Sequence, residues 1–212
     1  FVRHGLYAQR FFQKEFGTRA RVGFNPDSFG HTGTLPQILK KMGIDYYVYM
    51  RPSPPHEMQY PDGTTFWWRA NDGSEVLACQ ISDYGGDGQR VVDRFRHYPS
   101  YPYLNPNQRH ILGFYGVGNH GGGPTKHTIK LLLDAQHDES MPVLLFSTLG
   151  EYFDAITAPK EKMAIPTIDR DLQHHARGCY SAHAEVKKLN RSAEHALMAA
   201  ERFASLVWLV EE

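Results

Sequence analysis

The sequence has little of three things that would narrow its class at once: cysteine, net charge and long apolar runs. Its 212 residues contain only two cysteines, too few for a disulfide framework and too few to indicate a compartment. The 23 acidic and 23 basic residues balance, so charge gives no reason to expect a nucleic-acid partner or a membrane surface. We find no apolar run long enough to cross a bilayer and no secretory signal. What remains is a chain long enough to bury a sizeable core.

The order of the first elements is that of an α/β protein. The pattern predicts a helix over Phe1–Phe16 that ends at Gly17, a strand at Arg21–Phe24, a helix at Leu35–Met42 and a strand at Tyr46–Met50. Strand, loop, helix and strand in this order form a parallel α/β unit, in which functional residues gather at the carboxyl ends of the strands.

The rest of the chain predicts a hairpin and then a mixture of strands and helices. The strands Thr64–Ala70 and Glu75–Ile81 flank Asn71-Asp72-Gly73, a good hairpin turn. A change of composition near 158 predicts a domain boundary. The other predicted elements are a glycine-rich loop at 82–89, an irregular stretch at 97–109, strands at Ile111–Val117 and Val143–Ser147, helices at Lys126–His137, Leu149–Ile156 and Ala182–Val210, and a linker at 157–168.

One stretch carries more chemistry than its neighbours, VGFNPDSFGHTGTLPQ. Asp27, Phe29 and His31 alternate in it and would share one face if the segment were extended. Thr34 and Gln37 have the spacing of a capping box, so Asp27 is not needed as the cap of the following helix. From the residues alone, an isolated Asp-x-x-x-His is more often a pair of loop side chains that satisfy backbone amides.

Two further motifs have competing interpretations. His174 and His175 could hold a metal ion, but a chain with 12 histidines produces such a pair by chance. The loop GVGNHGGGPT fits the Gly-x-Gly-x-x-Gly pattern of dinucleotide-binding proteins. Pro124 and the extra glycines delay the following helix, the motif falls late in the chain, and no acidic residue ends a next strand, so dinucleotide binding is the weaker hypothesis.

Six segments together resemble glycoside hydrolase family 38, the zinc-dependent retaining α-mannosidases, and they follow one another over nearly the whole chain. They are NPDSFGH, LPQILKKMGI, MRP at 50–52, FWW at 66–68, HGGGPT at 120–125 and QHHxxGCY at 173–180. The resemblance is to the bacterial and cytosolic-type enzymes, and it implies a cytoplasmic location and a mannose-containing carbohydrate substrate, with a homo-oligomer as an option.

The resemblance also implies a fold. Residues 1–158 would form an incomplete (β/α) barrel of the seven-stranded family 38 type, and residues 159–212 a linker and the first helix of a three-helix bundle. The chain begins without Met inside a helical pattern. We therefore expect a fragment of a larger protein.

The roles that the resemblance implies begin with the metal. Asp27 would be both the catalytic nucleophile and a ligand of Zn²⁺, and His175 would be a second ligand. The family supplies two more ligands from a His-x-Asp motif, and no such motif occurs between Phe1 and Asp27. We expect that half of the zinc site is missing and that the isolated fragment is inactive.

Three more residues would bind substrate. Phe29 would lie against the sugar, Arg51 would keep the Asp27 carboxylate ionised and oriented, and Tyr84 would contact the substrate. Without the resemblance, Phe29 is more simply a core ring and Arg51 a surface ion-pair partner.

The sequence departs from the family at the acid/base. The loop GNHGGGPT has Asn119 where the family has an aspartate, and an amide cannot deliver a proton at neutral pH. His120 could replace the acid, or the chain could be a catalytically impaired relic that binds zinc and sugar. A mannosylglycerate hydrolase of the same family is the other alternative.

Overall fold

The structure, a computed structural model, describes every residue except 53–62, 98–103, 119–121, 159–162, 174–175 and 212. It divides into two compact units, Phe1–His175 and Ala176–Glu212. The boundary predicted near 158 falls inside the first unit.

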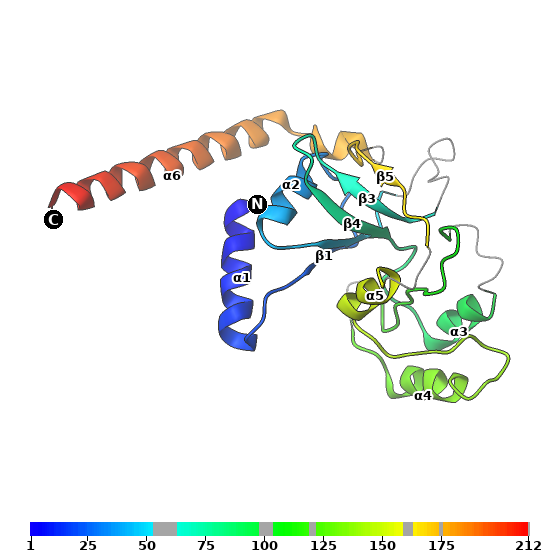
Figure 1. Ribbon diagram of the computed structural model, residues 1–212. Helices are drawn as coiled ribbons and strands as arrows, with labels where there is room; N and C mark the ends of the chain where they lie inside the picture. Colours follow the sequence, from blue (N-terminus) through cyan, green and yellow to red (C-terminus); the bar gives the residue numbers. More distant parts are fainter. Residues whose placement is uncertain (53–62, 98–103, 119–121, 159–162, 174–175, 212) are drawn as a thin grey trace. The chain divides into compact units, whose positions relative to one another are not determined.

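A five-stranded sheet forms the centre of the first unit (Figure 1). Its strands are β1 (Val22–Asn25), β2 (Tyr46–Tyr49), β3 (Thr65–Arg69), β4 (Glu75–Gln80) and β5 (Thr167–Ile168). Their order across the sheet is β1-β2-β4-β3-β5. β1, β2 and β4 are parallel, β3 is antiparallel to β4, and β5 is parallel to β3. The α/β class and the β3–β4 hairpin are confirmed, whereas β5 lies in a stretch predicted to be a linker.

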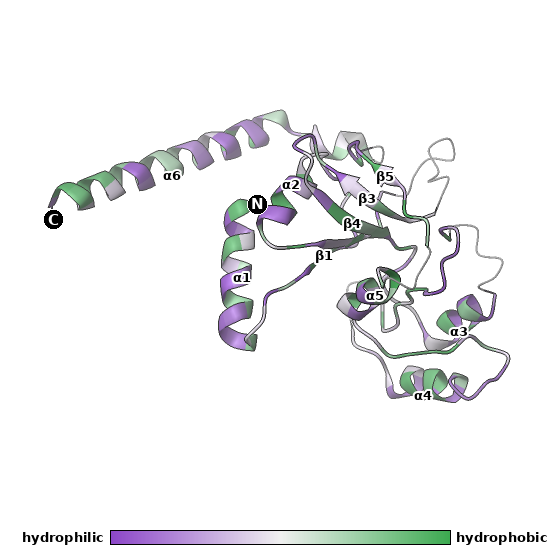
Figure 2. Ribbon diagram, in the orientation of Figure 1, coloured by the Kyte–Doolittle hydropathy of each residue, from purple (hydrophilic) through white to green (hydrophobic). Residues whose placement is uncertain are grey.

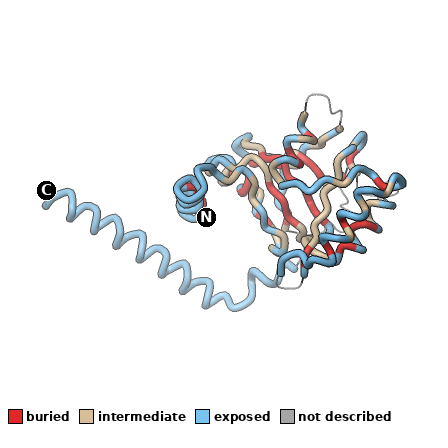
Figure 3. Tube along the Cα trace, turned by 90° about the horizontal axis from the view of Figure 1, so that it is seen from below, coloured by how far each residue is buried: buried red, intermediate tan, exposed pale blue. Residues whose placement is uncertain are grey.

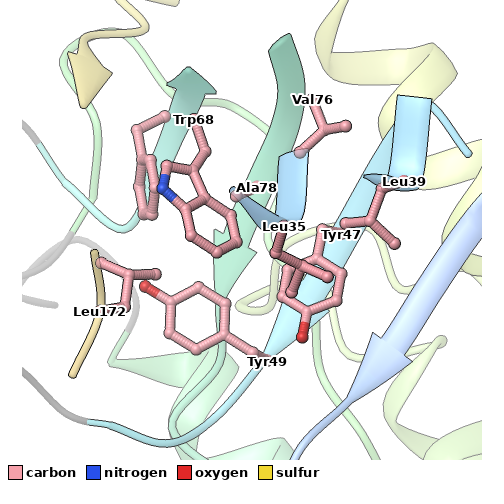
Figure 4. Packing of buried hydrophobic residues seen from close by; sticks show 9 residues of the cluster. Leu35, Leu39, Tyr47, Tyr49, Trp68, Val76, Ala78 and Leu172 are labelled. Atoms are coloured by element: carbon pink, nitrogen blue, oxygen red, sulfur yellow. The ribbon is translucent and has the colours of Figure 1, made fainter. Parts of the chain in front are cut away.

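The residues of β2 and β4 alternate between two hydrophobic clusters, one on each face of the sheet. This alternation explains why the strands read as nearly continuous apolar runs. One cluster consists of Leu35, Leu39, Tyr47, Tyr49, Phe66, Trp68, Val76, Ala78 and Leu172 (Figure 4). The other consists of Val48, Leu77, Cys79, Ile81, Tyr152, Phe153 and Ile156. Buried residues therefore concentrate in the sheet and in the helices against it (Figure 3).

The first unit also contains helices. They are α1 (Val2–Phe16), α2 (Leu35–Lys41), α3 (Gly88–Arg96), α4 (Lys126–Ala135) and α5 (Leu149–Ile156). α1 ends where predicted, at Gly17, whose φ of 69° suits glycine. A buried Gln9 fastens α1, since its amide donates to the carbonyls of Ala20 and Met42 at 2.8 and 2.9 Å and accepts from Ala20 N–H at 2.9 Å.

Two predicted strands are wrong, although their residues are described. Ile111–Val117 makes only an isolated bridge, between Gly116 and Gly86. Its Leu112 and Phe114 pack against the cluster that includes α5 without joining a ladder. Val143–Ser147 runs along the surface, with Val143 86% exposed. An apolar run indicates a tendency to be buried, and a strand also needs a neighbour with a free edge.

Two signals at helix starts were also misread. Thr34 makes no side-chain cap to α2, so the predicted capping box is wrong, and a capping box occurs instead at Thr148 and Glu151 before α5. The sequence prediction missed α3, which begins inside the predicted glycine-rich loop. Its start is marked by Asp87, whose carboxylate accepts from the Arg90 backbone N–H at 2.8 Å.

The second unit consists of a short 3-10 helix, Arg177–Tyr180, and α6 (Ala184–Glu211). The long helix predicted at Ala182–Val210 is thus confirmed within two residues. Apolar and polar residues are mixed along α6 (Figure 2), and its apolar positions are exposed. In the part of the chain that the structure describes, we find no helix with the length and apolar character needed to span a membrane.

Candidate active site

The three parallel strands bring the ends of β1, β2 and β4 to one edge of the sheet. Asn25, Tyr49 and Gln80 are paired neighbours and are the last residues of these strands. Asp27 and Arg51 each follow two residues later, so the two side chains leave adjacent strands at the same level. This edge is where α/β sheets place their ligand sites.

Asp27, Phe29 and Arg51 lie together, as the predicted roles require. The Arg51 Nε–H donates to Asp27 Oδ1 at 2.7 Å, and the guanidinium lies over the Phe29 ring, 5.6 Å from its centroid. The Asp27 side chain is 56% exposed and that of Arg51 42%. Such a pair contributes little to stability in water, but it orients a carboxylate that a ligand can reach.

Backbone hydrogen bonds hold the loop after β1 and the loop after β2 against each other. The N–H groups of Met50 and Arg51 both donate to the Pro26 carbonyl, at 3.1 and 3.0 Å. The position of Asp27 relative to Arg51 is therefore set by main-chain bonds next to both residues and by one charged side-chain bond.

His31 does not share a face with Asp27, because the segment is not extended, which the shared face would require. A turn at Pro26-Asp27 ends the extended conformation, and His31 is buried, with 3% of its surface exposed. Its ring lies edge-on to Tyr47 and Tyr49, two rings of the cluster in Figure 4.

The hydrogen bonds of His31 define its protonation. Nε2 lies 2.8 Å from the Arg51 carbonyl, which can only accept, so this nitrogen carries the proton. Nδ1 then accepts from the Tyr47 hydroxyl at 3.0 Å. Burial lowers the pKa of His31, against the opposing effect of the bond to Arg51, and burial raises the pKa of Tyr47 well above its ordinary value. The imidazole is thus neutral and the phenol remains a donor.

A segment from the end of the first unit lies beside the Asp27 loop. His31 and Leu172 exchange two backbone hydrogen bonds, each 2.9 Å long. A side chain at Gly30 would collide with the Gln173 side chain, 2.6 Å from its Oε1. The sequence around the predicted zinc ligand His175 therefore joins the loop of Asp27, while His175 itself lies outside the described residues.

The described residues provide only one of the predicted metal ligands. Asp27 offers a carboxylate, a donor that zinc accepts. Among the residues that the structure describes, no three His, Cys, Asp or Glu side chains form a group able to hold a metal ion. The described part of the chain thus fits a contribution to a zinc site but does not form a complete one.

The loop of Tyr84 adjoins the glycine-rich segment. Gly86 and Gly116 form an antiparallel bridge, and a Cβ at Gly85 would lie 3.3 Å from Gly118 Cα. Tyr84 is partly buried against the cluster that includes α5. Asn119 and His120, the predicted places of the acid, lie outside the described residues, but their neighbour Gly118 is held against this loop.

The described residues around the glycine-rich loop do not have the strand and the helix that dinucleotide binding requires. That motif needs a strand immediately before its glycines, and the described residues 111–118 form none. The next helix begins only at Lys126, beyond the reach of a bound pyrophosphate.

Gln80 was missed by sequence reasoning. Its Nε2 donates to the carbonyls of Met50 and Pro52, both at 3.2 Å, and only 9% of its surface is exposed. The available signal was a polar amide at the end of an otherwise apolar strand, EVLACQ.

A family model and several known proteins match this chain. Glycosyl hydrolases family 38, N-terminal domain, matches residues 1–175. The chain is 31% identical to alpha-mannosidase G of Dictyostelium discoideum over all of its own length and 19% of that protein. It is 30% identical to human alpha-mannosidase 2C1, covering 97% of this chain and 20% of that protein.

The fold has a counterpart among solved structures. The crystal structure of an alpha-mannosidase from Enterococcus faecalis superposes with a TM-score of 0.63 at 18% identity, over 82% of this chain and 20% of that one. The chain spans about a fifth of the length of the curated relatives it matches. From the match over residues 1–175 and the identity along its whole length, the chain belongs to glycoside hydrolase family 38.

Proposed function

We propose that this chain supplies the nucleophile side of a retaining α-mannosidase and works as part of a longer protein. The observation that carries this proposal is the Asp27–Arg51 pair, a reachable carboxylate oriented at 2.7 Å by a guanidinium at the carboxyl edge of the sheet. The family membership and the alpha-mannosidase relatives support the substrate class, terminal α-mannosyl residues of oligosaccharides or glycans.

The proposed reaction has two displacements. An Asp27 oxygen attacks the anomeric carbon while the bond to the leaving oxygen breaks. That oxygen takes a proton from a group at or near 119–120 where one can donate it, as His120 would, and otherwise departs as an anion. Water then gives its proton to the same group and attacks the anomeric carbon, which releases mannose and restores the Asp27 carboxylate. Arg51 orients Asp27 throughout, and Phe29, beside the guanidinium, would lie against the sugar.

Zinc is a proposed cofactor, with Asp27 and His175 as the ligands from this chain. When bound, it would hold two hydroxyls of the mannose and favour a distorted ring. Further ligands would come from the rest of the longer protein. We also propose that β1, which pairs only with β2 among the described strands, continues into a seven-stranded barrel, and that α6 packs its apolar positions in a three-helix bundle.

Hydrolysis with retention tests the function. The full-length protein should release α-mannose as the first product from an aryl α-mannoside, observed by NMR before the anomers equilibrate. A first product of β-mannose would contradict the covalent mechanism. Turnover of mannosylglycerate but not of mannobioses would replace the proposed substrate, and no turnover of any mannoside would identify a binding relic.

Zinc should bind weakly to the 212-residue chain, because two ligands leave a tetrahedral site half empty. We expect a dissociation constant weaker than about 1 µM by calorimetry, since complete structural sites bind far more tightly. Asp27→Asn should weaken binding further, whereas Asp154→Asn, at another exposed carboxylate, should not. A stoichiometric site tighter than this limit would contradict the proposed ligand set.

A further inference from the structure

Two buried side chains hold the backbone of the turn that carries Arg51. His31 donates to the Arg51 carbonyl at 2.8 Å, and Gln80 donates to the carbonyls of Met50 and Pro52 at 3.2 Å each. Three successive carbonyls are thus bonded by side chains from two other segments. His31 is 3% and Gln80 9% exposed, so all three bonds are largely shielded from water.

This arrangement is more than the packing of the core requires. An imidazole and an amide cost free energy to bury, and their hydrogen bonds to the three carbonyls offset that cost. The hydrogen bonds of His31 and Gln80 also fix the orientation of the peptide groups to which they bond. The carbonyls of Met50, Arg51 and Pro52 are all hydrogen-bonded. The peptide planes of the turn therefore have little freedom to rotate.

We infer that His31 and Gln80 are positioning residues that fix the 50–52 turn and thereby hold the Arg51 guanidinium on Asp27. An exposed ion pair alone is a weak constraint, because two long side chains lose conformational freedom to form it. A rigid backbone under Arg51 removes part of that loss. The inference deepens the proposed function and depends on it for the role of Asp27.

His31 is itself held in the orientation that this role needs. The Tyr47 hydroxyl donates to Nδ1, which leaves the proton on Nε2, facing the Arg51 carbonyl. The backbone of His31 is bonded in both directions to Leu172. The ring can therefore neither flip nor change tautomer without losing a bond that is buried.

The first test needs no substitution. Long-range nitrogen–proton correlation spectra of the 212-residue chain should show His31 neutral and protonated at Nε2. A proton on Nδ1, or rapid exchange between both nitrogens, would overturn the inference, because neither state donates steadily to Arg51.

The second test uses Gln80→Met and its matched control, Gln9→Met. Both glutamines are buried and donate to two backbone carbonyls, but Gln9 belongs to α1 and bonds to Ala20 and Met42, not to the turn of Arg51. The readout is the exchange of the Arg51 Nε–H with water, its signal identified by its loss in Arg51→Lys. In Gln80→Met we expect the exchange rate of the Arg51 Nε–H to rise on the order of tenfold, which corresponds to a weakening of its bond to Asp27 by about the net contribution of one hydrogen bond. In Gln9→Met the rate should stay within about twofold.

Unfolding midpoints measured in parallel separate positioning from a general loss of stability. Equal exchange rates in both variants would overturn the inference. If Gln80→Met does not fold, Tyr47→Phe takes its place, since it removes one hydroxyl and should also accelerate the exchange of the Arg51 Nε–H. None of these readouts requires hydrolysis, so they remain decisive if the proposed mannosidase activity is absent.

Discussion

Asp27→Ala in the full-length protein should lower kcat/KM on an aryl α-mannoside by at least about 10³-fold, or about 4 kcal/mol of barrier. The substitution removes the proposed nucleophile and leaves Arg51 without its partner at 2.7 Å. Azide should partly restore turnover and yield β-mannosyl azide, because a small anion can occupy the vacated position and attack from the same side.

The chain offers a close control for this loss. Asp154 is also an exposed carboxylate bonded to an arginine, Arg21, at 2.9 Å, and its side chain is 53% exposed. Asp154→Ala should leave kcat/KM within about twofold, since exposed pairs contribute little. A fall of less than tenfold in Asp27→Ala, or equal losses in both variants, would show that the nucleophile lies elsewhere.

Asn119→Asp should raise turnover of a natural mannobiose by about 10²–10⁴-fold, the usual contribution of general acid catalysis. An amide at the place of the acid leaves the departing oxygen without a proton donor. The dinitrophenolate of a dinitrophenyl mannoside leaves without being protonated, so the hydrolysis rate of that substrate should change little. The measurement is the ratio of the two rates in the full-length protein, with and without the substitution.

The competing explanation gives the acid role to His120. In that case the natural protein hydrolyses mannobiose well, Asn119→Asp leaves the ratio unchanged, and His120→Gln lowers the rate on mannobiose far more than on the dinitrophenyl mannoside. We favour loss of the acid, and an unchanged ratio in Asn119→Asp would contradict it.

The fold could be predicted where local pattern and pairing agree. β2 and β4 combine apolar runs with neighbours on both sides, and Gly73, at φ 84°, marks the hairpin between β3 and β4. The prediction failed where pairing depends on distant residues. The two residues of β5 carry no local signal, because Trp67 and Trp68 on β3 define that strand.

The candidate site could be predicted only in part. Two segments that resemble the family, NPDSFGH and MRP, indicated Asp27, Phe29 and Arg51, and the parallel order of the strands explained why they meet. The hydrogen bonds of His31 and Gln80 to the 50–52 turn were not predicted, because their acceptors are backbone carbonyls, and the sequence does not show which side chains those carbonyls meet.

The bridge between His31 and Leu172 has a consequence for synthesis on the ribosome. The chain from β1 to β4 can assemble soon after it emerges, because those strands are close in sequence. The Asp27 loop gains its last backbone partners only when Leu172 has left the exit tunnel. Until then the backbone N–H and C=O of His31 lack the partners that they have in the finished protein. A stalled nascent chain would therefore present β1 to β4 with a loosely held Asp27 loop, open to proteases and chaperones.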